Sequence, residues 1–345
     1  MRKVTLFTTI FFLVLLAACQ KDENPLSYKI EPYKVINNFW QPVTEVPGQS
    51  IYTITSDSDG NLYIGTNIGL YRSSDFGNSW EKISDLHPIQ NIYISPYHNI
   101  KIIGVSGHFG TFTHYSIDGG STWLTPTISP HGSIRQFIML PTGEIFAGTW
   151  FHDESAGGLY MSPDTCKTWE FTTLGPGFSI KGLALNSNND LYAALWHRNT
   201  DSILLFFSNT QGESWSEITR FDSSRNISTV LINNRNEIII SSNKGIIISR
   251  DYGESWESIG LEQYELSTYL MAIDNKNNLI VEAYGEFNSP KIFLLLDSYD
   301  TWYALEGLSV LRDIYAIVIG LDRHIYVVKD YELYKSKEPI DTVLN

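Results

Sequence analysis

The chain has 345 residues, of which 13% are aromatic and 18% charged, and its formal net charge at pH 7 is −14. This acidic balance argues against nucleic acid or an anionic membrane surface as the main partner. The length and the lack of long helical periodicity are typical of one large all-β domain.

The first 18 residues have the layout of a secretory signal peptide. A basic start at Arg2 and Lys3 precedes an apolar run over residues 4–16, which is shorter than a membrane-spanning helix requires. Residues 16–19, Leu-Ala-Ala-Cys, resemble a lipobox, which implies that Cys19 is the lipidated first residue of the mature protein.

The residues behind that cysteine extend the resemblance. Residues 20–23, Gln-Lys-Asp-Glu, resemble the acidic export tag of surface lipoproteins in some Gram-negative bacteria. The resemblance implies an outer-membrane protein that faces the cell exterior and contacts the membrane through its lipid anchor only. We therefore predict a signal peptide over residues 1–18, a lipidated tether over residues 19–37 and one domain over residues 38–345.

One eight-residue frame, Ser-x-Asp-x-Gly-x-Ser/Thr-Trp, recurs through this domain. It is clearest at residues 73–80 and returns, in places modified, at residues 116–123, 162–169, 208–215, 249–256 and 295–302. Its Trp residues are 41 to 46 positions apart, which is the period of propeller blades.

The frame resembles the Asp box of the BNR, or sialidase-type, repeat, in which it forms the turn between the third and fourth strands of a blade. A short carboxylate accepts hydrogen bonds from nearby backbone amides, and glycine supplies a conformation that other residues resist. We therefore expect a structural role for Asp75, Asp118, Asp164 and Asp251. Cys166 replaces the glycine of the third box and Thr210 the aspartate of the fourth, so we expect these two turns to be less regular.

Six boxes account for most of the domain, and the two ends of the chain supply the remainder. Residues 38–44 read like the strand that follows each box, and residues 310–336 like three inner strands. We therefore predict an all-β, seven-bladed β-propeller with four-stranded antiparallel blades, its ring closed by the N-terminal strand completing the last blade.

Two tryptophans depart from the repeat. Seven of the nine lie in the box register, whereas Trp150 and Trp196 hold an equivalent position in adjacent blades, and Tyr284 holds it in a third. They begin long connections that, in such propellers, lie on the face opposite the boxes. Rings there either anchor a sugar or protein partner or only cover their own loops. The candidate ligand-binding residues of these connections are Trp150, His152, Trp196, His197, Arg198 and Tyr284.

A second departure is a column of varied residues early in the inner strands. It consists of Tyr52, Gln90, Arg135, Lys181, Ser228, Tyr269 and Tyr315. Such a ring around a channel suits a small polar or anionic ligand, although a solvated lining without a ligand is the alternative. Because Arg135 and Lys181 share blades with the two extra tryptophans, we add Arg135, Lys181, Tyr269 and Tyr315 to the candidates.

Glu282 is the third departure, because other second strands have Gly, Ala or Ser at this position. A carboxylate there must be paired or have a raised pKa. One interpretation is that Glu282 is paired and has a structural role. The other is a catalytic acid, with Asp153, Glu154 or Glu286 as a second carboxylate for glycoside cleavage. We find no metal-ligand spacing and no cofactor motif, and expect neither a metal nor a cofactor.

Asp boxes occur in sialidases, xyloglucan-cleaving endoglucanases, photosystem assembly factors and sortilin-type receptors, so the resemblance implies a fold and not an activity. The sialidase Arg-Ile-Pro signature is absent. We favour a non-catalytic cell-surface lipoprotein that binds a glycan or protein partner on the face opposite the boxes. A glycoside hydrolase, lyase or sialidase-like enzyme acting on extracellular polysaccharide is one alternative, and a structural subunit of an envelope assembly is the other.

Overall fold

The computed structural model describes residues 33–48, 50–97, 103–106, 112–127, 129–150, 157–197, 200–222, 224–261, 266–284, 290–298, 301–308 and 314–342. All of these belong to the second of two compact units, Pro32–Asn345. Six of the predicted functional residues lie outside the described residues: Cys19, His152, Asp153, Glu154, Arg198 and Glu286. Among the described residues, no helix is long and apolar enough to cross a membrane.

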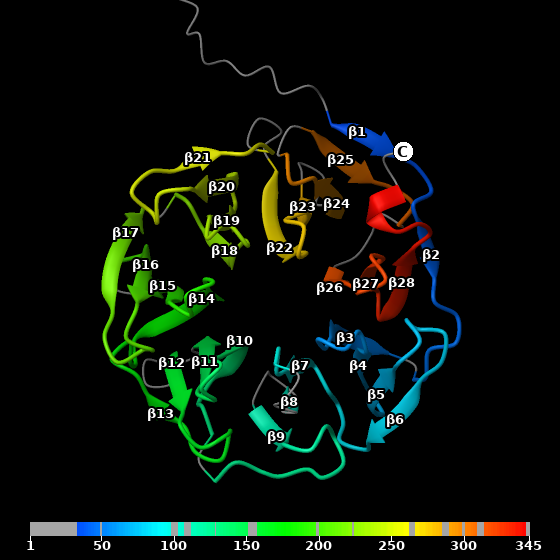
Figure 1. Cartoon of the computed structure of the whole chain (residues 1–345), viewed down its shortest axis with the longest axis horizontal. Coiled ribbons are helices and arrows are strands. Elements are labelled where there is room, and N and C mark those ends of the chain that lie inside the picture. Colours follow the sequence, from blue (N-terminus) through cyan, green and yellow to red (C-terminus); the bar gives the residue numbers. More distant parts are fainter. Residues whose placement is uncertain are drawn as a thin grey trace, which may run out of the picture. The chain divides into compact units, whose positions relative to one another are not determined.

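The strands of this unit form small sheets around a central opening (Figure 1). In chain order the sheets contain β3 (Ile51–Ser56), β4 (Leu62–Thr66), β5 (Gly69–Ser73) and β6 (Glu81–Ser84); β7 (Asn91–Ile94), β8 (Ile103–Ser106) and β9 (Phe112–Ser116); β10 (Ser133–Met139), β11 (Ile145–Trp150), β12 (Gly158–Ser162) and β13 (Glu170–Phe171); β14 (Phe178–Leu185), β15 (Leu191–His197), β16 (Ser202–Ser208) and β17 (Ser216–Phe221); β18 (Ile227–Ile232), β19 (Ile238–Ser242), β20 (Gly245–Ser249) and β21 (Glu257–Ser258); β22 (Ser267–Ile273), β23 (Leu279–Tyr284), β24 (Pro290–Leu295) and β25 (Trp302–Leu305); and β26 (Ile314–Ile319), β27 (Ile325–Lys329) and β28 (Glu332–Ser336). We name each blade by its innermost strand.

The prediction of seven four-stranded antiparallel blades is wrong. Four antiparallel strands occur in six blades, those of β3, β10, β14, β18, β22 and β26. Within the described residues the β7 sheet has three strands, and the chain after its box adds only one bridge, between Tyr115 and Leu124. The next hydrogen-bonded position of that ladder falls on Pro126, which has no N–H to donate, so a fourth strand does not extend.

Two further strands come from the N-terminal segment, residues 34–42. β1 (Lys34–Ile36) pairs parallel with β25 and gives the β22 blade a fifth strand. β2 (Trp40–Pro42) pairs antiparallel with β28 and is the outermost strand of the β26 blade. The indole N–H of Trp40 donates to the carbonyl of Leu305 at 3.1 Å, so this segment joins the outer edges of the last two blades.

The apolar core lies between neighbouring blades. One cluster combines residues of β19 and β20 with residues of β23 and β24, and another combines β15 and β16 with β18 and β19. All residues of β19 and β20 are buried, because a middle strand is covered on both faces by the adjacent blades. The last blade also contacts the first, since the Tyr326 hydroxyl donates to the carbonyl of Phe76 at 2.9 Å. The blades therefore support one another around the ring.

The Asp boxes form tight turns with a repeated set of hydrogen bonds. Asp75 accepts from the backbone amide of Ser79 at 2.8 Å and from its hydroxyl at 2.6 Å, and the Gly77 amide donates to the Ser73 hydroxyl at 2.8 Å. Equivalent bonds surround the other three box aspartates: Asp118, Asp164 and Asp251.

The two modified boxes keep the same turn, contrary to our expectation of lower regularity. The Thr210 hydroxyl takes the place of the missing carboxylate and accepts from the Ser214 amide at 2.9 Å. Cys166 adopts the positive φ of the glycine it replaces, 69°, and its amide still donates to Ser162 at 2.9 Å. The surrounding hydrogen bonds thus impose the turn even on residues that disfavour it.

These bonds predict acid sensitivity. Neighbouring hydroxyl and backbone N–H groups lower the pKa of Asp75, Asp118 and Asp251 to about 2. Because the folded-state pKa lies below the unfolded value, the folded protein binds fewer protons, and the resulting stability is lost as pH falls from about 4 to about 2. Urea unfolding of the wild type should show this loss.

The matched variant replaces all three aspartates with asparagine. We expect Asp75→Asn/Asp118→Asn/Asp251→Asn to be less stable at neutral pH and to lose less stability between pH 4 and pH 2. An unchanged pH dependence in the triple variant would show that other carboxylates control acid unfolding.

Candidate functional site

A β-bulge interrupts the start of six innermost strands. In each case the pairing with the second strand shifts by one residue, between Ile51 and Thr53 in β3 and at equivalent points in β10, β14, β18, β22 and β26. A bulge leaves one residue out of the ladder and changes the direction of its side chain. The residues at these bulges belong to the predicted channel column: Tyr52, Arg135, Lys181, Ser228, Tyr269 and Tyr315.

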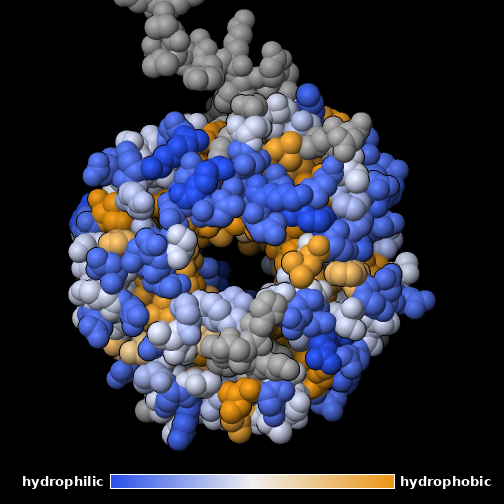
Figure 2. All heavy atoms as spheres, viewed as in Figure 1, coloured by the Kyte–Doolittle hydropathy of each residue, from blue (hydrophilic) through white to orange (hydrophobic). Residues whose placement is uncertain are grey.

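The polarity around the opening is uneven. Figure 2 shows the opening at the centre of one face, with hydrophilic residues gathered along the upper part of its rim. The bulges differ as well, because those of β10 and β14 carry cations whereas those of β22, β26 and β3 carry tyrosines.

Trp150 and Trp196, at or near the ends of β11 and β15, stack on each other. Their ring centroids are 5.8 Å apart and their planes differ by 9°. The Lys181 ammonium lies 4.5 Å from the centroid of the Trp150 ring, and the Arg135 guanidinium 5.2 Å from it, within the range of cation–π attraction. Both rings are half-buried. They form one wall shared by two blades.

This wall borders a cavity of about 260 Å³, which we call the cation cavity. It is lined by Trp150, Lys181, Trp196, Asp201, Ile203, Arg225 and Asn226. The indole N–H of Trp196 donates to Asp201 at 3.0 Å, and Lys181 donates to Asn226 at 3.3 Å. The guanidinium of Arg225 donates to the Ser242 hydroxyl at 3.0 Å. Three blades thus contribute to one cavity.

Asp201, Arg225 and Asn226 were not among the residues predicted from the sequence. The signal was present for two of them, because Arg225 and Asn226 stand directly before β18, a few positions ahead of the channel column. The connection that enters each inner strand lies on the same face as the channel column, and extending the column toward the N-terminus would have found them.

Lys181 is under electrostatic strain in this cavity. Burial, together with the positive charge of Arg135, lowers the pKa of Lys181 to about 8. Asp201 is the one carboxylate among the described lining residues, and it already accepts from Trp196. A bound anion would therefore relieve the repulsion between the cations and form charge-assisted hydrogen bonds with them.

Tyrosines occupy the bulges of three consecutive blades on the other part of the rim. Tyr315 stacks on Tyr331 at 5.0 Å, the edge of Tyr52 meets Tyr331 at 5.7 Å, and Tyr269 packs edge to face with Tyr284 at 5.2 Å. The exposed fractions of Tyr269, Tyr315 and Tyr331 are 45%, 37% and 40%. We call these five residues the tyrosine arc. Tyr331, in the turn between β27 and β28, was not among the predicted residues.

The other candidates lie in less open surroundings. Glu282 is 2% exposed in β23 and accepts a hydrogen bond from the Tyr284 hydroxyl at 2.8 Å, so it is buried with a partner. His197 packs against the ring of Phe178 at 5.1 Å, and its Nδ1 lies 3.1 Å from the Thr200 hydroxyl. Within the described part of the chain, no group of three or more His, Cys, Asp or Glu side chains is placed to hold a metal ion.

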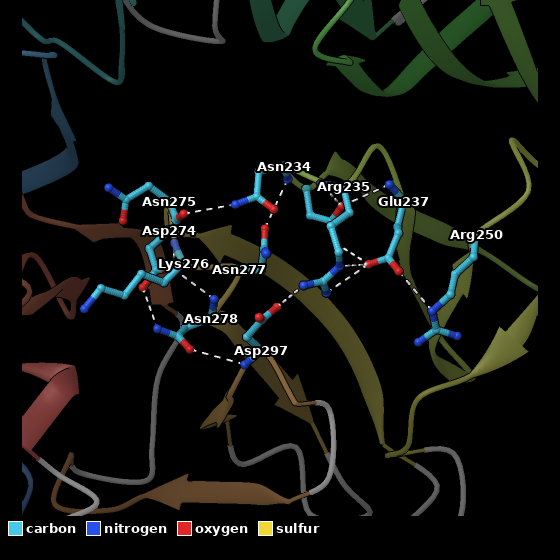
Figure 3. Close-up of polar contacts among 11 residues, drawn as sticks. Asn234, Arg235, Glu237, Arg250, Asp274, Asn275, Lys276, Asn277, Asn278 and Asp297 are labelled. Atoms are coloured by element: carbon cyan, nitrogen blue, oxygen red, sulfur yellow. Dashed lines mark hydrogen bonds and ion pairs between the residues drawn. The ribbon is translucent and has the colours of Figure 1, made fainter.

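A second polar cluster joins the turns that follow β18 and β22 (Figure 3). The backbone N–H of Asn234 donates to the side-chain oxygen of Asn277 at 3.1 Å, while Arg235 pairs with Glu237 and Asp297. Asn277 has a φ of 61°, a conformation that asparagine tolerates. A cavity of about 550 Å³ next to this cluster is lined in part by Lys276 and Asp341, which pair at 3.0 Å. These charges connect neighbouring blades and point to a structural role.

Comparisons with known proteins agree with this architecture. The family model of the two component regulator propeller matches residues 45–67. The search of curated proteins returned no significant match. Together with the ring of blades, the comparisons identify the chain as a β-propeller protein.

The solved structures with a similar fold include the following three. YCF48 from Cyanidioschyzon merolae is 16% identical with a TM-score of 0.61, covering 86% of this chain and 98% of its own, and YCF48 is also known bound to D1 peptide. The extracellular domain of a one component system of B. thetaiotaomicron is 13% identical with a TM-score of 0.64, over 88% of this chain and 40% of that one. The GH74 enzyme of Niastella koreensis is 15% identical with a TM-score of 0.62, over 86% and 53%. At these identities the similarity concerns the fold.

Proposed function

We propose that this propeller is a non-catalytic binding protein that holds an acidic group of a glycan or protein partner at the cation cavity. The observation that carries the proposal is the convergence of Arg135, Lys181 and Arg225 around the stacked pair Trp150 and Trp196. Positive charges brought together at a partly buried site cost free energy unless an anion binds there.

The setting in which it binds is part of the same proposal. The Asp-box frame, the lipobox ending in Cys19 and the acidic residues behind it support an outer-membrane lipoprotein of the BNR type that faces the cell exterior, with the domain boundaries given above. Extracellular domains of sensor proteins and YCF48 with its D1 peptide are examples of similar propellers. They make a binding role at the cell surface consistent with the fold.

Removal of two of the three cations, Arg135 and Lys181, tests the proposal. We expect Arg135→Gln/Lys181→Met in the full-length protein to weaken the binding of acidic ligands at least ~10-fold, because charge-assisted hydrogen bonds contribute about 1.5–3 kcal/mol each. The measurement is a binding screen with uronic-acid oligosaccharides and acidic peptides, followed by titration calorimetry. Lys337→Met, at an exposed lysine, is the matched control and should bind like the wild type.

A pH series gives an independent reading of the same site. Lys181 must be protonated to hold an anion, and its pKa in the free protein is about 8, so affinity should be constant below pH 8 and decrease above it. Arg135 and Arg225 keep their charges there. Unchanged affinity in the double variant, with no alkaline decrease in the wild type, would refute the cation cavity as the binding site.

A further inference from the structure

The two kinds of bulged residue lie on different arcs of the same opening. Arg135 and Lys181 come from β10 and β14, whereas Tyr269, Tyr315 and Tyr52 come from β22, β26 and β3, largely across the opening in Figure 1. Because each of them stands at the same point of its strand, the bulges place cations and tyrosines at a similar depth of the channel. One extended ligand that crosses the opening would meet both arcs.

The tyrosine arc has the properties of a sugar-binding surface. Its rings are amphipathic, with an apolar face and a hydroxyl, and three of them are 37% to 45% exposed. Ring-to-ring contacts hold them in place, with Tyr315 on Tyr331 and Tyr52 against Tyr331. A pyranose presents flat C–H faces and a rim of hydroxyl groups, which match such a ring. Little side-chain entropy is lost on binding because the tyrosines are already fixed by each other.

We propose that the ligand is a polysaccharide with carboxylated sugars, whose carboxylates bind at the cation cavity and whose pyranose rings pack on the tyrosine arc. This inference rests on the proposed function and narrows its ligand class. An acidic peptide would satisfy the cations only, whereas each unit of a uronic-acid polymer presents both a carboxylate and a ring face. The tyrosine arc is thus a second binding site that fixes the choice of ligand.

The test compares two full-length variants against matched ligands. The tyrosine variant is Tyr269→Leu/Tyr315→Leu, which keeps apolar volume and removes the rings, and the cation variant is Arg135→Gln/Lys181→Met. The probes are oligogalacturonate, its methyl ester, alginate and hyaluronan oligosaccharides, and a poly-glutamate peptide. We expect at least one acidic oligosaccharide to bind, and both variants to weaken that binding at least ~10-fold. Where the methyl ester of that sugar is available it should bind weakly, and the tyrosine variant should leave any peptide binding unchanged.

The outcomes separate this inference from the proposed function. Loss of binding in the cation variant with full binding in the tyrosine variant overturns the tyrosine arc and leaves the cation cavity standing. Peptide binding without binding of any acidic oligosaccharide also overturns it, and assigns a protein partner instead. If both variants bind as tightly as the wild type, both sites are refuted. Urea unfolding of each variant checks that its fold is intact, and single Tyr315→Phe, which keeps the ring, should retain binding if stacking is the cause.

Discussion

Replacement of Asp330 by asparagine is expected to destabilise the protein by about 3 kcal/mol, because it removes the charge that faces a buried lysine. Lys329, the last residue of β27, is 1% exposed, and its ammonium lies 2.6 Å from the Asp330 carboxylate. Asp330 has a φ of 55°, which asparagine also adopts readily. Asp330→Asn therefore changes the charge and keeps the turn. Urea unfolding at neutral pH measures the loss.

Lys329→Met provides the matched comparison. It removes the buried cation and leaves Asp330, whose side chain is 24% exposed and reaches solvent. We expect Lys329→Met to cost less than Asp330→Asn, and Lys329→Met/Asp330→Asn to regain much of the stability that Asp330→Asn loses. A double variant as unstable as Asp330→Asn alone would mean that the loss arises from the turn and not from removal of the charge at Asp330.

The second large effect is expected from Gly65→Ala, at about 2–3 kcal/mol. Gly65 is in β4, and a Cβ atom there would lie 2.5 Å from the carbonyl oxygen of Ile89, which leads into the next sheet, and 2.9 Å from a methyl group of Thr53. The backbone carbonyl of Ile89 cannot rotate away as a side chain does, so the two sheets must separate. A Cβ atom at Gly148 would likewise be close to the following blade, at 2.5 Å from a side-chain methyl group of Ile180.

Gly175→Ala is the control for this prediction. A Cβ atom at Gly175 would have its nearest neighbour at 3.5 Å, an ordinary van der Waals distance, without a positive φ. We expect its free energy of unfolding to stay within about 0.5 kcal/mol of the wild type. Equal stability of Gly65→Ala and Gly175→Ala, measured by urea unfolding, would contradict close packing between blades as the reason for glycine at position 65.

The repeat made the strands and turns predictable, since each box ends one strand and begins the next. The predicted number of four-stranded blades was wrong because of the blade that contains Pro126. Its frame at residues 116–123 is intact and does not indicate that the following strand stops at a single bridge. The expected irregularity at Cys166 and Thr210 failed for a related reason. A local substitution rarely changes a turn that several hydrogen bonds already determine.

The candidate site was predictable as a set of positions and not as a set of contacts. Alignment of the repeats identified Arg135, Lys181, Trp150 and Trp196 as departures, because equivalent positions in neighbouring blades differ. It did not indicate that the two indoles stack on each other, since that depends on the rotation between adjacent blades. It also missed Arg225, which reaches the cavity from a third blade.

The N-terminal segment, residues 34–42, also affects the order in which the blades can be completed during synthesis. β2 leaves the ribosome before the strands β3 to β27, and its partner β28 leaves after them, with Trp40 opposite Ser336. The other six blades take their antiparallel strands from neighbouring sequence, whereas this one must wait until β28 has been made. A nascent protein therefore carries an unmatched outer strand until β28 has emerged, and a product that stops before residue 332 never acquires the partner for it.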